Sequence, residues 1–454
     1  MMYSLGIDIG TSGIRAVVLD EHQQKVAQAQ SALPESLAYY SEQQSEQQSE
    51  HQIIGYSQDP QDWWKTFEQV MLQLVQELES KNLSLAVISH LAIDGTSGTV
   101  LFTDSAGTPC SDALMYNDQR AVEQARKIQA LAPENTAAIG STSGLAKLLW
   151  LHEHSDCPDS IHYALNQSDW LSGKLMAAFG LSDHNNVLKM GYDAQHQCWP
   201  DWLIDFLQSQ HFPVSALPRV FIPGQIMGTI SADMQQHFGF HPDLKICAGT
   251  TDSTAAIIAS GAKDEGEAIT SLGSSLVMKV ISRHPIFDRR SGVYSQPYGD
   301  FWLVGGSSNS GGAVLKPFFC PGEMSEYTEA LNKKISQGQF KMLNLNYYPL
   351  LTPGERFPIL DPELEPKLSP RPEQDIDFFQ SLLEGMASIE TLSYQRLLEL
   401  GAPYPKRVTS VGGGAFNKAW RYIREQKLGV PVLLAEQEQA ASGTAILAQT
   451  TWNQ

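Results

Sequence analysis

The chain is poor in basic residues, long apolar runs and paired cysteines, and each shortage excludes a class of protein. Its 31 lysines and arginines stand against 50 aspartates and glutamates, a formal net charge of −19. Binding a nucleic-acid backbone needs clustered lysine and arginine, so we expect no nucleic-acid partner. No run of 18 apolar residues and no basic leader segment occur. We therefore expect a cytoplasmic protein without a membrane partner.

Several familiar motifs are also missing. There is no Gly-x-x-x-x-Gly-Lys-Ser/Thr loop, no Gly-x-Gly-x-x-Gly after a strand and no Gly-x-Ser-x-Gly turn. Their absence argues against a P-loop kinase, a Rossmann dehydrogenase and a serine hydrolase. The five cysteines form no Cys-x-x-Cys pair, which is typical of reduced, structural thiols. Because 454 residues exceed what one core supports, we predict two domains, residues 1–228 and 229–454, in a monomer or homodimer.

The N-terminal segment, residues 3–20, has two apolar runs that flank the turn Gly10-Thr11-Ser12-Gly13. This pattern predicts a β-hairpin that holds phosphate. Its glycines can take positive φ and bring backbone N–H groups to an anion, and its hydroxyls add donors. Asp8, just before the turn, stands where a hydrated Mg²⁺ would sit. An ordinary tight turn is the alternative.

A second segment, residues 268–280, repeats this design around Gly273-Ser274-Ser275. Two such hairpins suggest two related domains whose turns clamp opposite sides of one polyphosphate. An acidic protein that binds a triphosphate must neutralise it locally. Helix N-termini, backbone nests and Mg²⁺ are the available means.

Between the hairpins, the first half of the chain alternates strands and helices. Residues 41–50 are a low-complexity polar tract, which we interpret as a surface insertion. A helix is expected from Asp62, and residues 145–210 are expected to be largely helical. The expected core positions of these segments are Trp64, Phe67, Met71, Leu74 and Leu78 in the first, and Trp150, Trp170, Trp199 and Trp202 in the second.

A buried strand expected over residues 85–93 runs into Asp94-Gly95-Thr96-Ser97. In an open α/β sheet, ligands bind beyond the carboxyl ends of the strands, so these side chains are candidates for holding a polyol. A structural Asx-type turn is the alternative. Asp118, in an aromatic and polar segment that opens an expected helix, is either a sugar contact or a helix cap paired with Arg120. We place the domain junction near Gly228.

In the second half, residues 245–259 comprise a short strand, a Gly-hydroxyl turn, Asp252 and a helix of small residues. Asp is a favoured N-cap, but Thr250, Thr251 and Ser253 supply other caps, which favours Asp252 as a catalytic base. Residues 408–420 run from a strand through Gly412-Gly413-Gly414 into a helix, a turn that lets a flat ring and its ribose approach the backbone. Residues 305–312 are either another wall of that pocket or a flexible loop.

The Asp8 hairpin, the Asp118 segment, Gly249-Thr250-Thr251-Asp252, Gly273-Ser274-Ser275 and Gly412-Gly413-Gly414-Ala415-Phe416-Asn417 follow one another in an order that resembles the FGGY carbohydrate kinases. The resemblance covers nearly the whole chain. It implies α/β architecture, with two RNase H-like (actin-like ATPase) domains and ATP and a sugar bound in an interdomain cleft.

The resemblance also implies roles for individual residues, with Asp252 as catalytic aspartate and Asp8 at the Mg²⁺ and first phosphate position. The predicted sugar contacts are Asp8, Ser12, Gly13, Gly95, Thr96, Ser97, Asp118 and Asp252. The predicted ATP contacts are Thr11, Ser12, Gly13, Arg15, Gly273, Ser274, Ser275, Gly311, Gly413, Gly414, Asn417 and Trp420.

The expected reaction is transfer of the γ-phosphoryl group of MgATP to a terminal sugar hydroxyl. Typical xylulose kinases carry a Gln-Met-His segment where this chain has Asp94-Gly95-Thr96-Ser97. Here the chain looks more like the shorter cyanobacterial and plant-type kinases of the family, which act on D-ribulose. We therefore expect a ketopentose acceptor, D-ribulose first and D-xylulose second. A non-catalytic nucleotide-binding scaffold of the same fold is the alternative of another class.

Overall fold

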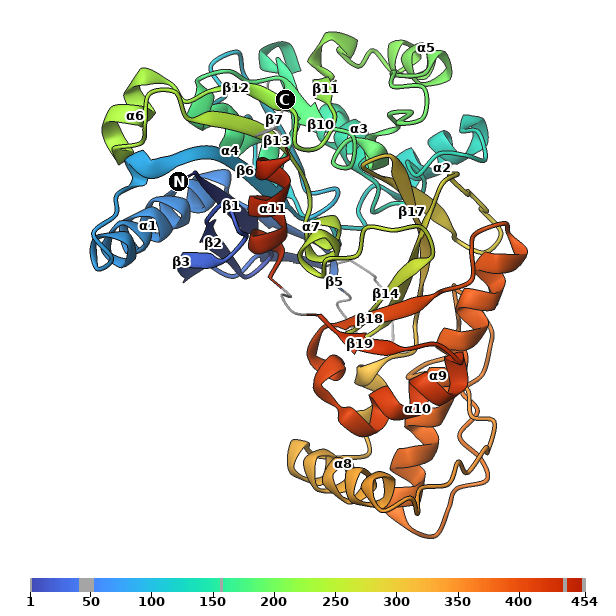
Figure 1. The fold of residues 1–454 in the computed structure, drawn as a ribbon. Helices are drawn as coiled ribbons and strands as arrows, with labels where there is room; N and C mark the ends of the chain where they lie inside the picture. Colours follow the sequence, from blue (N-terminus) through green and yellow to red (C-terminus); the bar gives the residue numbers. More distant parts are fainter. Residues whose placement is uncertain (1, 41–52, 156–157, 436–438, 451–454) are drawn as a thin grey trace. The chain divides into compact units, whose positions relative to one another are not determined.

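The computed structural model describes residues 2–40, 53–155, 158–435 and 439–450, and shows two compact units, each with its own sheets and helices (Figure 1). Unit 1 comprises Met1–Ala259 and Gln439–Gln454, and unit 2 comprises Ser260–Glu438. The predicted polar insertion at 41–50 lies outside the described residues.

The division between the units differs from the one expected near Gly228. Strand β13 (Lys245–Thr251) pairs in parallel with β6 (Ile88–Gly95), and β12 (Ile226–Thr229) pairs with β13. Strand β12, which contains Gly228, and strand β13, which follows it, are therefore both part of the unit 1 sheet. The C-terminal helix α11 (Ala440–Gln449) also returns to unit 1.

The central sheet of unit 1 has the strand order β12-β13-β6-β1-β2-β3. Strands β1 (Tyr3–Ile9) and β2 (Gly13–Leu19) form the antiparallel hairpin predicted from sequence, and β3 (Lys25–Ala32) continues it. Strand β1 is parallel to β6, as is β13. The carboxyl ends of β1, β6 and β13 therefore share one edge of the sheet.

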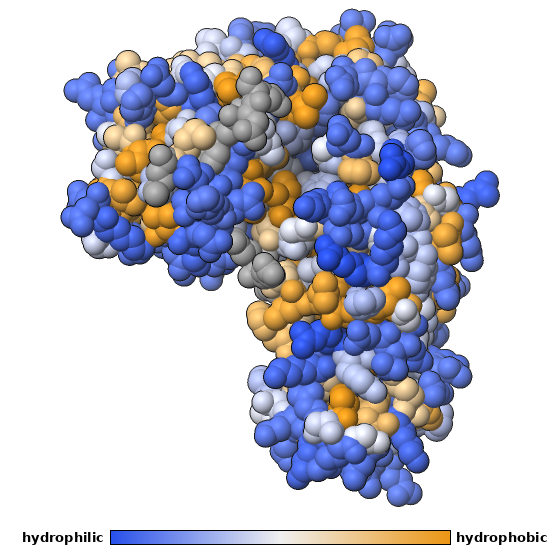
Figure 2. All heavy atoms as spheres, viewed as in Figure 1, coloured by the Kyte–Doolittle hydropathy of each residue, from blue (hydrophilic) through white to orange (hydrophobic). Residues whose placement is uncertain are grey.

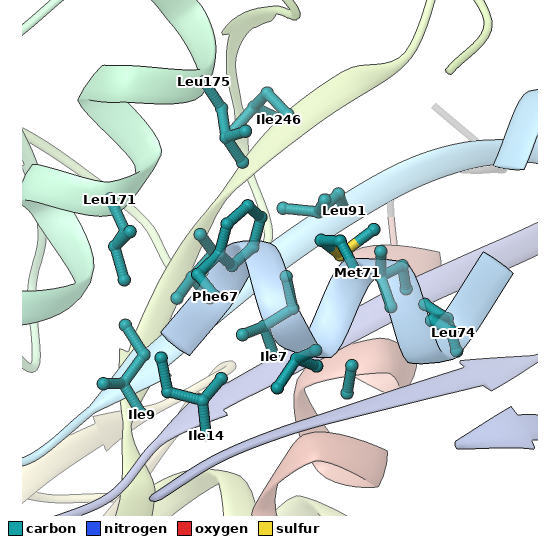
Figure 3. Close-up of a cluster of buried hydrophobic side chains, with 14 of the residues drawn as sticks. Ile7, Ile9, Ile14, Phe67, Met71, Leu74, Leu91, Leu171, Leu175 and Ile246 are labelled. Atoms are coloured by element: carbon teal, nitrogen blue, oxygen red, sulfur yellow. The ribbon is translucent and has the colours of Figure 1, made fainter. Parts of the chain in front are cut away.

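Helix α1 (Pro60–Glu79) covers one face of this sheet (Figure 3). It begins after Asp59, whose side chain accepts a hydrogen bond from Gln61 N. Phe67, Met71 and Leu74 meet Ile7, Ile9 and Ile14 in a cluster that also includes Leu171, Leu175, Leu91 and Ile246. The predicted stripe is confirmed except at its first position, where Trp63 is buried and Trp64 only partly so.

Helix α11 packs against the sheet at Gly6. A β carbon at Gly6 would lie 2.0 Å from the Ala441 carbonyl oxygen, so only glycine permits this approach. Side chains alternate along a strand, so Asp8 projects from the same face of β1 as Gly6. The same helix therefore lies on the sheet face from which Asp8 projects.

The rest of unit 1 surrounds this sheet. A second sheet has the order β4 (Leu37–Tyr40), β5 (Ile53–Gln58), β8 (Ala113–Leu114), β7 (Val100–Thr103) and β9 (Tyr163–Asn166), and β10 (Leu181–Asp183) pairs with β11 (Arg219–Phe221). The other helices are α2 (Val122–Leu131), α3 (Gly144–Glu153), α4 (Gln167–Met176), α5 (Asp201–Ser209), α6 (Ala232–Phe238) and α7 (Asp252–Ala259). Strands β9 and β10 interrupt the region expected to be helical, and of its four tryptophans only Trp170 is fully buried.

The sheet of unit 2 has the order β16-β17-β15-β14-β18-β19. The predicted second hairpin is confirmed as β14 (Glu267–Leu272) and β15 (Leu276–Ser282). The remaining elements are β16 (Tyr294–Tyr298), β17 (Phe301–Ser308), β18 (Arg407–Val411), β19 (Val432–Leu434), α8 (Pro321–Ser336), α9 (Asp375–Glu399) and α10 (Lys418–Leu428). Buried side chains of α9 and α10 form much of the core.

Hydrophilic residues cover much of the face drawn in Figure 2, in keeping with the high charge of the chain. None of the helices that the structure describes is both long and apolar enough to cross a membrane.

Candidate active site

Three aspartates meet where β1, β6 and β13 end. Asp8 and Asp94 are register partners on β1 and β6, and Asp94 is in turn the partner of Thr250 on β13. Asp252 follows β13 directly as the first residue of α7. Parallel pairing thus brings together carboxylates that are far apart in the sequence.

Asp8 and Asp94 form a buried carboxyl pair. Asp94 is fully buried and Asp8 is 5% exposed. The Thr444 hydroxyl of α11 donates a hydrogen bond to Asp94, and the Arg15 guanidinium lies 3.5 Å from Asp8 Oδ2. Burial raises the pKa of Asp8, and burial together with the neighbouring Asp8 charge raises the pKa of Asp94 well above its usual range. Carboxylate oxygens are ligands that Mg²⁺ prefers, but among the described residues no group of three or more His, Cys, Asp or Glu side chains is placed to hold a metal ion, so a Mg²⁺ site at Asp8 stays a prediction.

Asp252 is half-buried at the start of α7. Its Oδ1 accepts a hydrogen bond from Ser253 N at 2.6 Å. The hydroxyls of Thr251 and Thr254 bond to each other at 3.1 Å, so polar contacts flank this helix start. Both predicted roles, helix cap and base, are compatible with this position, and catalysis by Asp252 stays a prediction.

Lys189 is a neighbour of Asp252 that sequence reasoning missed. Burial lowers the pKa of its ammonium group, and the Asp252 carboxylate opposes that shift. A β carbon at Gly98 would lie 3.6 Å from Lys189 Cδ, so the lysine side chain also reaches the 95–98 loop. No local pattern marks Lys189, because its neighbours come from the start of α7 and from the loop after β6.

Lys147 also holds the loop of residues 95–98 in place. It is fully buried, and its Nζ donates to the carbonyl oxygens of Gly98 at 2.5 Å and Met115 at 2.7 Å. Burial lowers its pKa to about 7. The lysine therefore ties the loop after β6 to the segment that follows β8.

Within the predicted polyol loop, Thr96 is buried and its hydroxyl already bonds to other residues, whereas Ser97 is less buried. The Thr96 hydroxyl bonds to Gln167 Oε1 at 3.0 Å and to the Thr99 hydroxyl at 2.5 Å. Gly95 is buried against Gln167. Ser97 is thus the hydroxyl of this loop with most access to a ligand.

Asp118 is fully buried and makes structural contacts. Its Oδ2 lies 2.9 Å from Arg120 Nη2 and accepts a hydrogen bond of 2.9 Å from Tyr56 N. The Arg120 guanidinium also lies 3.9 Å from the centre of the Tyr39 ring. The expected cap is corrected, because α2 begins only at Val122. The ion pair expected as the structural alternative is present, and a sugar contact stays a prediction.

The first predicted phosphate turn has a different geometry from the one expected. Neither Gly10 nor Gly13 has a positive φ. Gly13 is required instead by close packing, because a β carbon there would lie 2.7 Å from Ser31 O. Thr11 and Ser12 are exposed at the tip, and a pocket lined partly by Ser12, Gly13 and Arg15 adjoins it.

In unit 2, three glycine-rich turns meet at the ends of β14, β17 and β18. Gly312 N donates to Gly273 O at 2.9 Å. A β carbon at Gly311 would lie 2.5 Å from Ser274 O. Gly412 has a φ of 85° and packs against Leu272 O. Residues 305–308 belong to β17, and Gly311 and Gly312 contact the Gly273 turn, so this segment is not a free loop. Its role as a wall of the nucleotide pocket stays a prediction. Gly273 and Ser274 are themselves exposed.

The segment after the Gly412 turn supports that turn. Asn417 Oδ1 accepts a hydrogen bond from Trp420 N at 2.9 Å, and its Nδ2 donates to the Thr328 hydroxyl at 3.0 Å. Trp420 is 2% exposed, and a β carbon at Gly414 would lie 2.6 Å from its ring. Gly413 and Phe416 are exposed. The predicted adenosine contacts of these residues stay predictions, and Phe416 is an aromatic surface that the sequence reasoning did not assign.

The architecture defines a class. Each unit has a mixed α/β sheet that opens with a β-hairpin, and the whole chain shares the actin-like ATPase fold of solved sugar kinases. The xylulose kinase of Rhodospirillum rubrum has a TM-score of 0.82 at 20% identity, over 98% of this chain and 89% of that one. The Plasmodium falciparum glycerol kinase with ADP has a TM-score of 0.81 at 17% identity, over 99% and 89%.

Sequence comparison assigns the family. Residues 3–259 match the N-terminal domain, and residues 268–452 the C-terminal domain, of the FGGY family of carbohydrate kinases. The chain belongs to this family, as its motifs predicted, and is a phosphotransferase with an alcohol group as acceptor. Sugar kinases of this family use ATP.

Curated relatives span most of the chain at low identity. The xylulose kinase of Staphylococcus epidermidis is 23% identical over 98% of this chain and 87% of its own length. The Escherichia coli xylulose kinase is 23% identical over 92% and 83%.

Proposed function

We propose that this kinase phosphorylates a terminal hydroxyl of a ketopentose, with D-ribulose preferred and D-ribulose 5-phosphate as product. The observation that carries the proposal is the convergence of Asp8, Asp94 and Asp252 at one sheet edge in a chain of the FGGY family. The preference for D-ribulose rests on Asp94-Gly95-Thr96-Ser97, which replaces the Gln-Met-His segment of typical xylulose kinases.

In the proposed reaction Asp252 orients the sugar hydroxyl and accepts its proton as the new O–P bond forms and the bond to the departing ADP breaks. The transition state of phosphoryl transfer is loose, so positioning and charge neutralisation supply most of the catalysis. An aspartate with an ordinary pKa near 3.9 suffices as a late proton acceptor. Lys189 lies close enough to Asp252 for the carboxylate to favour the charged form of the lysine.

Mg²⁺ and the nucleotide are assigned to different groups in this proposal. Asp8 and Asp94 would hold the ion, which when bound neutralises phosphate charge. The turns at Gly273, Gly311 and Gly412 would hold the nucleotide through backbone N–H groups, as anion-binding concavities do. This arrangement suits an acidic protein, because it needs no cluster of basic side chains.

D-xylulose is the second candidate acceptor, since the curated relatives that match most of the chain are named xylulose kinases. The two sugars differ at a single hydroxyl-bearing carbon, so the same catalytic groups serve both. The difference lies in the contacts that the acceptor makes, where Ser97 is our candidate.

A sugar panel tests the proposal. ADP release would be measured with D-ribulose, D-xylulose, L-ribulose, glycerol and gluconate, and the phosphorylated product identified by mass spectrometry. We expect the highest kcat/KM for D-ribulose. A higher value for D-xylulose would select the second candidate. If the protein binds MgADP but phosphorylates no sugar, the catalytic proposal is wrong and the nucleotide-binding scaffold is supported.

A further inference from the structure

A fully buried polar network lies beneath the glycine turns of unit 2. Arg424 of α10 donates to both carboxylate oxygens of Glu390 of α9, with Nε to Oε2 at 2.6 Å and Nη2 to Oε1 at 2.7 Å. The Thr270 hydroxyl of β14 donates to Glu390 Oε1, and Arg424 Nη1 donates to the Ser410 hydroxyl of β18 at 2.6 Å. Glu390 and Arg424 are 1% and 0% exposed.

The network contacts the sheet of unit 2 through two residues at the same position along neighbouring strands. Thr270 and Ser410 are register partners on the parallel strands β14 and β18. These strands lead directly into the turns that begin at Gly273 and Gly412, and the two turns touch where Gly412 packs on Leu272. Arg424 also belongs to α10, the helix that Asn417 caps. Beside the backbone ladder that pairs the two strands, and the Tyr394 hydroxyl that also bonds to Thr270, this ion pair links both strands just before their turns to the helix that follows the second turn.

The composition of the network is unusual for an element that serves stability alone. The free energy needed to remove two charges from water offsets much of the attraction between them. Apolar residues of similar size therefore often stabilise a fold equally well. What the bidentate pair supplies beyond burial is a fixed distance and orientation between the groups that it joins. Here those groups are the strands beneath the glycine turns.

We propose that Glu390 and Arg424, with Thr270 and Ser410, are positioning residues that set the spacing of the Gly273 and Gly412 turns and thereby the affinity for a nucleoside triphosphate. The inference rests on the assignment of these turns to the nucleotide in the proposed function. It adds residues that touch no substrate and that lie outside every predicted contact.

The test compares the same substitution at two positions of one helix. Glu384, also on α9, is 3% exposed and accepts hydrogen bonds from Leu343 N and Asn344 N, away from both strands. Glu390→Gln and Glu384→Gln would be compared for thermal midpoint, MgADP affinity by calorimetry, and KM for ATP and for sugar. We expect Glu390→Gln to weaken nucleotide binding by about tenfold, the scale of a small misplacement of binding groups, with little change in KM for sugar. Glu384→Gln should leave both constants near the wild-type values.

Two milder variants keep the test decisive if Glu390→Gln does not fold. Ser410→Ala removes the hydroxyl contact to Arg424, and Thr270→Val removes the contacts to Glu390 and Tyr394. Neither leaves a charge unpaired, and each should raise KM for ATP by a few fold. Unchanged nucleotide affinity in folded variants, or equal losses for Glu384→Gln, would overturn the positioning role. Wild-type protein that binds no MgADP would instead contradict the nucleotide assignment of the proposed function, so the two failures are distinguishable.

Discussion

The two units present different chemical groups at the ends of their central strands. In unit 1 the strand ends carry the side chains of Asp8, Asp94 and Asp252. In unit 2 the corresponding strands end in turns around Gly273 and Gly412, where backbone groups are exposed and little side chain intervenes. Carboxylates take up protons and hold cations, whereas backbone N–H groups bind anions. Our proposal therefore assigns the acceptor chemistry to unit 1 and the backbone contacts of the nucleotide to the turns of unit 2.

The largest expected effect concerns the carboxylates of unit 1. Asp252→Asn should lower kcat by about 10²- to 10⁴-fold, the usual contribution of a general base, and leave MgADP affinity unchanged. ADP release and calorimetry measure the two quantities. Asp243→Asn, the same change at an exposed position of unit 1, is the control. Full activity in the Asp252 variant would remove Asp252 from the mechanism.

A smaller effect is expected from the glycine turns of unit 2. Gly311→Ala places a β carbon 2.5 Å from Ser274 O, so the Gly273 turn must shift. We expect KM for ATP to rise about tenfold, because a displaced turn no longer aligns its N–H donors. Steady-state kinetics with varied ATP checks this. Gly322→Ala, where the nearest atom would be 3.8 Å away, should behave like wild type. If both variants show the same KM, the turn has no part in binding ATP.

Lys189→Met tests whether catalysis in unit 1 also depends on the positive charge of this lysine. Loss of the positive charge beside Asp252 should lower kcat/KM for the sugar by about fivefold, the scale of one partly screened charge contact, with KM for ATP unaffected. Kinetics at fixed, saturating ATP measure the effect. An equal loss for both substrates would indicate general damage rather than a role at the acceptor.

The smallest effect on activity is expected from Asp183, a fully buried acid whose pKa is raised by burial and by Asp169 to about 7. Because the folded pKa exceeds the unfolded value near 3.9, its contribution to stability is complete below pH 4 and is lost as pH rises through 7. The free energy of unfolding should therefore fall by about 1.4 kcal/mol per pH unit for one proton between pH 4 and 7, and level off above pH 7. Thermal midpoints measured from pH 5 to 8 should fall and then level off in the same way. Asp183→Asn should flatten this profile. An identical profile in the variant would assign the pH dependence to other groups.

Local patterns in the sequence predicted the elements whose geometry depends on neighbours along the chain. Both hairpins, the start of α7 at Asp252 and the strand-to-helix turn at Gly412 are where they were expected. The expectations that failed depend on distant contacts. Gly13 is required by its close approach to Ser31 O rather than by a positive φ. The unit boundary lies after Ala259 rather than near Gly228, because β13 pairs with β6.

By itself the sequence determined the family, the α/β class and the order of the motifs, because turn chemistry and apolar periodicity are short-range properties. Tertiary structure alone decided that Asp8 lies beside Asp94, that the charge of Asp252 acts on Lys189, and that Arg424 and Glu390 link two strands. These neighbours come from elements separated by long stretches of chain. Strand register and helix packing bring them together, and neither is written in the spacing of any one segment.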